Sequence, residues 1–175
     1  MWVRSAYAGE LAVLSTWLCG LAPWALTVGR VDQLDTTVWI FWFHIRRFLF
    51  LPGIELGGDG VPSWVWQFAE QPLYSGDSYV GLLWIAGTLV FLAALGFSVL
   101  YYCNEEEVEQ SQFDPVHVLG ALLLISGMLF TLVVGALWQN HPGTTVPLGI
   151  VLQLVFGVVL LQTERIESGE REQVA

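Results

Sequence analysis

Four long stretches of the chain contain no Asp, Glu, Lys or Arg. They cover residues 11–29, 80–103, 116–138 and 146–163, with lengths of 19, 24, 23 and 18 residues. A hydrocarbon layer about 30 Å thick is crossed by about 20 helical residues, since each adds about 1.5 Å. The pattern predicts four membrane spans, at about 8–29, 80–103, 116–138 and 146–163, in a single domain over residues 1–175.

Local signals place some of the helix ends. Asp114 followed by Pro115 predicts a helix start, because Asp accepts hydrogen bonds from unpaired amides and Pro fits the first helical position. Thr144, Thr145 and Pro147 predict a similar start for the last span. Pro23 predicts a kink near the end of the first span.

Residues 38–51 (VWIFWFHIRRFLFL) are rich in aromatic side chains and hold the paired Arg46 and Arg47. As a fifth span they would bury both arginines at about 2.5 to 3.5 kcal/mol each, which nearly cancels the gain of about 0.3 to 0.6 kcal/mol from each apolar residue. Pro52-Gly53 interrupts the segment, and a fifth span would put the termini on opposite sides. We therefore predict an interfacial or re-entrant segment at about 38–54, in which Arg46 and Arg47 reach lipid phosphates.

The predicted fold class is thus all-α: an integral membrane four-helix bundle with this aromatic segment after the first span and an acidic polar tail at 164–175. Small residues at helical spacing predict where helices pack closely. These helix-packing candidates are Ala12, Ser15 and Cys19 in the first span, Gly127, Thr131 and Gly135 in the third, and Gly149, Gln153 and Gly157 in the fourth. Gln153 is strongly polar in an apolar span, so its amide should find a partner inside the bundle.

Charge narrows the classes of partner. The chain has six Arg, no Lys and sixteen acidic residues, for a net charge of −10. This balance argues against nucleic acid and against binding of anionic headgroups through basic patches. The acidic, Lys-free segments suit a protein that works at high salt. Arg4 and Arg165 lie close to their spans, which favours both termini in the cytoplasm of a multi-pass protein of the cell membrane.

Candidate chemistry is sparse. Glu10 is a carboxylate near the body of a span, so a coupling or binding role is one interpretation and an interfacial carboxylate the other. In a four-span topology the three histidines, His44, His117 and His141, do not share a site. The sequence shows no catalytic motif, so we predict no catalytic residues, no cofactor and no metal site. Cys19 and Cys103 are expected to be free thiols.

The N-terminal run at residues 2–15 (WVRSAYAGELAVLS), followed by Pro23-Trp24 and by the segments at 145–149 and 155–161, resembles a group of small multi-pass membrane proteins of halophilic archaea. That group has no assigned activity. The resemblance implies a membrane location and a high-salt environment, and it transfers no functional residue.

Three functional hypotheses follow. The first is an accessory or interaction protein that acts through helix packing, with the lipid bilayer and a membrane protein or a second copy as partners. The alternative is a small transporter or channel component that uses Glu10 and Gln153. A membrane enzyme is the weakest of the three, because no nucleophile and base occur at a recognisable spacing.

Overall fold

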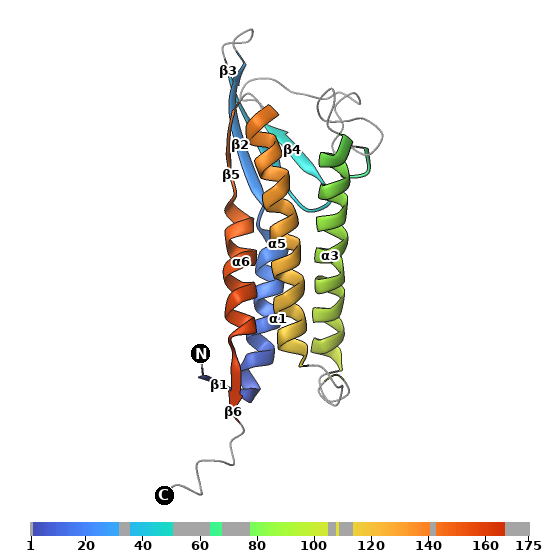
Figure 1. Cartoon of the computed structure of the whole chain (residues 1–175), viewed down its shortest axis with the longest axis vertical. Helices are drawn as coiled ribbons and strands as arrows, with labels where there is room; N and C mark the ends of the chain where they lie inside the picture. The colour runs from blue at the N-terminus through green and yellow to red at the C-terminus, as the bar shows by residue number, and fades with distance from the viewer. Residues whose placement is uncertain are drawn as a thin grey trace, which may run out of the picture.

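The computed structural model describes residues 2–31, 36–50, 64–67, 78–104, 108, 114–140 and 143–166. Within these residues the protein combines long helices with two small sheets, as Figure 1 shows. The helices are α1 (Ser5–Leu21), α3 (Ser78–Cys103), α5 (Pro115–Asn140) and α6 (Leu148–Leu161).

The larger sheet has four antiparallel strands in the order β4-β3-β2-β5. These strands are β2 (Ala25–Val31), β3 (Thr36–Trp42), β4 (Arg47–Phe50) and β5 (Thr144–Val146). At the opposite end of the helices, β1 (Trp2–Arg4) pairs in parallel with β6 (Glu164–Ile166). The two ends of the described chain therefore lie together, at the lower end of the helices in Figure 1.

The prediction of an all-α four-span bundle is wrong. The protein is mixed α/β, and among the described residues only α3 and α5 contain helical segments long and apolar enough to cross a membrane, at Tyr79–Cys103 and Pro115–Gln139. Helix α6 has 14 residues, which gives it a length of about 21 Å. That is shorter than the hydrocarbon layer of about 30 Å.

The first predicted span is divided at Pro23. Helix α1 ends at Leu21 and β2 begins at Ala25. Proline has no amide hydrogen and disfavours helical geometry in the residue before it. The β-branched residues Thr27, Val28 and Val31 then suit a strand. The uncharged run at 11–29 extends from the helix into the strand. Its length therefore led to the wrong prediction of one continuous span.

The aromatic segment, which was expected within an all-α fold, forms the strands β3 and β4, joined by a tight turn at residues 43–46. Val38, Ile40 and Trp42 of β3 face the helices and are buried. They pack with Trp24, Trp84 and Phe130 in one aromatic core, where the rings of Trp24 and Phe130 stack at 5.0 Å. The sheet thereby covers the ends of α3 and α5 nearest to it. Residues 51–54 lie outside the described residues.

Helix α6 starts against the junction between α1 and β2. Its N-cap is Pro147, which has no side-chain hydrogen bond, so the predicted Thr cap is not formed. Instead, the amide of Gly149 donates to the Pro23 carbonyl at 3.0 Å, and the amide of Ile150 donates to the Trp24 carbonyl at 3.3 Å. These bonds satisfy helix-start amides that otherwise have no partner.

Candidate functional site

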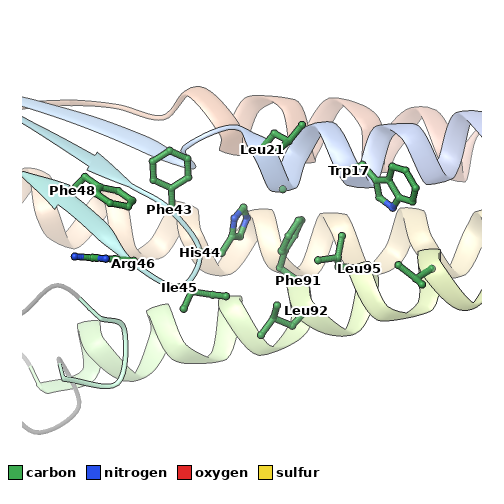
Figure 2. Close-up of a pocket in the computed structure, with 12 residues that line it drawn as sticks. Trp17, Leu21, Phe43, His44, Ile45, Arg46, Phe48, Phe91, Leu92 and Leu95 are labelled. Atoms are coloured by element: carbon green, nitrogen blue, oxygen red, sulfur yellow. The ribbon is translucent and has the colours of Figure 1, made fainter.

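The turn at residues 43–46 inserts between α1 and α3, as Figure 2 shows. The amide of Phe43 donates to the Arg46 carbonyl at 2.9 Å and closes the turn. The His44 carbonyl accepts hydrogen bonds from Trp84 Nε1, at 3.0 Å, and from Thr88 Oγ1, both on α3. These bonds hold the backbone of the turn against α3. They thereby fix the positions from which the side chains of His44 and Arg46 extend.

The His44 imidazole lies in the interior, with 5% of the residue exposed. It stacks on Phe91 of α3 at 3.7 Å and meets the Phe130 ring of α5 edge-on at 5.4 Å. Its Nε2 lies 2.8 Å from Nε2 of Gln153 on α6. His44 lies in the turn, outside the helices. Burial lowers the pKa of its imidazole from 6.5 to about 3. The imidazole is therefore neutral at physiological pH.

In the contact between His44 and Gln153, one polar atom of the Gln153 amide has no hydrogen-bond partner among the described residues. Gln153 is fully buried, and its Oε1 has no hydrogen-bond partner within the described structure. An unpaired buried acceptor of this kind costs about 1 to 3 kcal/mol. The sequence predicted that the Gln153 amide needs a partner inside the bundle, but it did not indicate that His44 is this partner.

An apolar groove of about 620 Å³ runs beside the turn, between α1 and α3. Figure 2 shows Trp17 and Leu95 toward one end of it, His44 and Phe91 in the middle, and Arg46 with Phe48 toward the sheet. The lining is almost entirely hydrocarbon and aromatic; its residues are Trp17, Gly20, Leu21, Phe43, His44, Ile45, Arg46, Phe48, Phe91, Leu92, Leu95 and Val99.

Arg46 supplies the charge at the sheet end of this groove. Its guanidinium carbon lies 4.9 Å from the centre of the Phe48 ring and 4.8 Å from that of Trp64. Its Nε is buried and has no hydrogen-bond partner among the described residues. Two aromatic faces therefore hold the cation while one of its donors stays unpaired.

Comparison with known proteins places the chain in a family. The matching family is one of unknown function, DUF7549, and the match covers residues 1–165. The chain belongs to this family. No curated protein matches it. DUF7549 membership agrees with the resemblance to a group that has no assigned activity, and it transfers no activity or site to this chain.

The other candidate polar residues lie apart in this DUF7549 protein. Glu10 is exposed on α1, next to Gly9, whose position faces the Tyr101 side chain on α3. His44, which contacts Gln153, meets α3 at Phe91, ten residues before Tyr101, which is about 15 Å along the helix. The structure thus does not bring Glu10 and Gln153 together. Arg47 lies over the Trp42 ring, with its guanidinium carbon 5.5 Å from the ring centre.

The helix-packing candidates fall into two groups. Ala12, Ser15 and Cys19 are buried on α1, and three glycines lie at close approaches to neighbouring elements. A Cβ atom at each would meet a neighbour: Leu154 for Gly127, the Pro23 carbonyl for Gly149, and Leu124 for Gly157. In contrast, Thr131 is exposed, and a Cβ atom at Gly135 would meet nothing within 4 Å. Gly127 and Gly135 point about 80° apart around α5, so they serve different surfaces.

Two further expectations concern the cysteines and the acidic groups. Cys19 and Cys103 are free, as expected. Asp114 Oδ1 accepts from the Val116 amide at 2.9 Å, which confirms the predicted cap, and its other oxygen lies 3.3 Å from His117 Nδ1. Among the described residues no group of three His, Cys, Asp or Glu could hold a metal ion. His141 and most of the residues at 105–113 lie outside the described chain.

Proposed function

We propose that this protein is embedded in a membrane through α3 and α5 and acts there as an accessory or binding protein. The observation that carries the proposal is the uncharged, exposed outer surface of both helices. Their most apolar segments are only 39% and 44% buried within the protein, whereas an apolar helix of a soluble core would be mostly covered. Leu82, Leu89 and Leu100 on α3 and Met128 and Leu132 on α5 each expose more than half of their surface.

The exposed apolar surface continues around the molecule. Leu14, Leu18 and Leu21 on α1 and Val151, Val155 and Val158 on α6 are also exposed. Soluble monomers rarely expose apolar patches larger than a few hundred Å². Lipid is therefore the solvent that fits the sides of the helices.

The sheet suits the headgroup level of the same membrane. Its strand register puts Leu26, Phe41 and Phe48 in one outward row and Val28, Trp39 and Phe50 in the next. Trp side chains such as that of Trp39 favour the interface between lipid and water. Open sheet edges need water or a partner, which the hydrocarbon layer cannot supply. We therefore place the four-stranded sheet at this level, at the end of the two segments of α3 and α5 that are long enough to cross the membrane.

An accessory role is supported by small residues that face outward. Thr131 and Gly135 leave space on the exposed side of α5, where another helix can approach closely. The alternative of a transporter that uses Glu10 and Gln153 has weaker support, since about 15 Å of helix separates their levels. Gln153 instead contacts His44.

Two measurements test the proposal. Membranes from cells that express the tagged chain are washed with alkaline carbonate, and we expect the protein to stay in the pellet until detergent is added. Release by carbonate alone would contradict the membrane location. Purification in mild detergent with mass spectrometry then tests for a partner protein or a second copy.

The partner test uses a matched pair of variants. Gly135→Leu should abolish partner binding, because the new side chain occupies the space on α5 that the partner helix would enter. Gly96→Leu is the control: its side chain also meets nothing within the protein, but it lies on α3, so partner binding should persist. A monomer without any partner in mild detergent would refute the accessory role.

A further inference from the structure

We propose that the groove between α1 and α3 binds one chain of an anionic phospholipid, with the lipid phosphate held by Arg46. This inference rests on the membrane location proposed above. It names the ligand, the guanidinium that binds the lipid phosphate, and the orientation of the lipid in the groove.

The lining of the groove matches a hydrocarbon chain. Leu92, Leu95 and Val99 of α3 and Trp17 and Leu21 of α1 form its walls below the turn. From Phe91 to Val99 the wall extends for about 12 Å along α3. At Gly20 a Cβ atom would come within 3.4 Å of the Phe91 ring, so the missing side chain helps to keep the groove wide. Apolar surface of this kind is costly to hydrate and favours a lipid chain.

The sheet end of the groove matches an anionic headgroup. The guanidinium of Arg46 is held between the Phe48 and Trp64 rings, and its buried Nε still lacks an acceptor among the described residues. Phosphate oxygens accept two parallel hydrogen bonds from a guanidinium and pair with its charge. A phosphate at this end of the groove therefore supplies a counter-charge for the Arg46 guanidinium.

The orientation of Arg46 fits a lipid in the bilayer. Figure 2 shows its side chain directed toward the sheet, away from Phe91 and Leu95. The membrane-crossing segment of α3 begins at Tyr79, at this same end. A phosphate at Arg46 thus lies near the membrane surface while the chain descends along Leu92 and Leu95. The net charge of −10 argues against a basic patch, but one placed guanidinium is sufficient for one headgroup.

Native mass spectrometry of the full chain tests the site. The protein is reconstituted in vesicles of equal phosphatidylglycerol and phosphatidylcholine, then extracted in mild detergent, and the retained lipids are counted. We expect one phosphatidylglycerol per chain in the wild type. Arg46→Gln should weaken this retention about tenfold or more, as expected for the loss of a charge-assisted contact. Arg47→Gln is the charge-matched control and should retain the lipid.

The chain-binding part of the groove has its own matched pair. Leu92→Trp narrows the groove and should reduce lipid retention, whereas Leu89→Trp adds the same bulk on an exposed part of α3 outside the lining. Circular dichroism checks that each variant is folded. Equal effects of the two substitutions would overturn the assignment of the chain to this groove.

The outcomes separate this inference from the proposed function. A protein that resists carbonate but retains both lipids equally, or keeps phosphatidylglycerol in Arg46→Gln, overturns the lipid site alone. Release by carbonate overturns the membrane location itself. If an equimolar fatty acid displaces phosphatidylglycerol, the ligand of the groove is a single-chain fatty acid, and the assignment to a phospholipid is overturned.

Discussion

His44 and Gln153 are 109 residues apart in the chain, yet their Nε2 atoms lie 2.8 Å from each other in the interior. The contact joins the turn of the β3–β4 hairpin to α6, and the His44 ring is also in contact with Phe91 and Phe130. Both side chains are buried, so each supplies the other with a polar partner that the surrounding rings cannot provide.

A double-mutant cycle should detect this pairing. Gln153→Leu should lower the free energy of unfolding by about 1 to 3 kcal/mol, because it leaves the His44 nitrogen buried without that partner. His44→Phe should lower the free energy of unfolding by a similar amount. In the double variant the decrease should be smaller than the sum of the two single decreases. Unfolding in mixed micelles measures the three values. Gln139→Leu, at an exposed site on α5, is the control; additive effects at 44 and 153 would contradict the pairing.

The pH dependence of stability should carry a contribution from His44. Its folded pKa of about 3 is below its ordinary value of 6.5, so between these values the unfolded state binds more protons. Stability therefore falls as pH decreases through this window, with a slope of up to about 1.4 kcal/mol per pH unit from this group. Above pH 6.5 the contribution is constant.

The difference between the wild type and His44→Phe isolates this term. Thermal unfolding measured at several pH values should give a shallower dependence in the variant below pH 6.5. Parallel curves would mean that His44 is not buried in its neutral form.

Two glycines should respond in opposite ways to the same substitution. A Cβ atom at Gly149 would lie 2.7 Å from the Pro23 carbonyl oxygen and 2.8 Å from Trp24 Cα. Gly149→Ala should therefore force α6 away from the α1–β2 junction and destabilise the protein. Gly135→Ala meets nothing within 4 Å, so it should be neutral or stabilising by up to about 1 kcal/mol through helix propensity. Melting temperatures of the two variants compare them directly.

The two cysteines should report burial and orientation. Cys19 is buried, whereas Cys103 is exposed at the end of α3 that lies with the chain termini. If the termini are cytoplasmic, a membrane-impermeant maleimide should label Cys103 only after the cells are opened. Cys19 should react only after denaturation, and Cys103→Ser identifies the labelled site. Labelling of Cys103 on intact cells would reverse the proposed orientation.

The two long helices could be predicted from local information. The uncharged runs at 80–103 and 116–138 correspond to α3 at Ser78–Cys103 and α5 at Pro115–Asn140. Asp114 and Pro115 marked the start of α5 because capping depends on neighbouring residues only. Each of these signals lies within a few residues of the feature that it predicts.

The sheet could not be predicted in this way. Strand β3 is apolar on both faces: Ile40 and Trp42 pack on the helices, while Trp39 and Phe41 face outward. Such a strand lacks the alternation of polar and apolar residues that distinguishes it from a helix. Thr144 and Thr145 were expected to cap a helix and Val146 to begin it, and only the pairing of these residues with Leu26, Thr27 and Val28 makes them strand β5.

By itself, the sequence determined the uncharged runs, the two long helices, the cap at Asp114 and the need of Gln153 for a buried partner, because these depend on composition and near neighbours. Only the tertiary structure decided that Pro23 separates a helix from a strand, that His44 is the partner of Gln153, and that Arg46 stands at the end of an apolar groove. Each of these depends on contacts between residues far apart in the chain, and such contacts arise only when the hairpin packs against the helices.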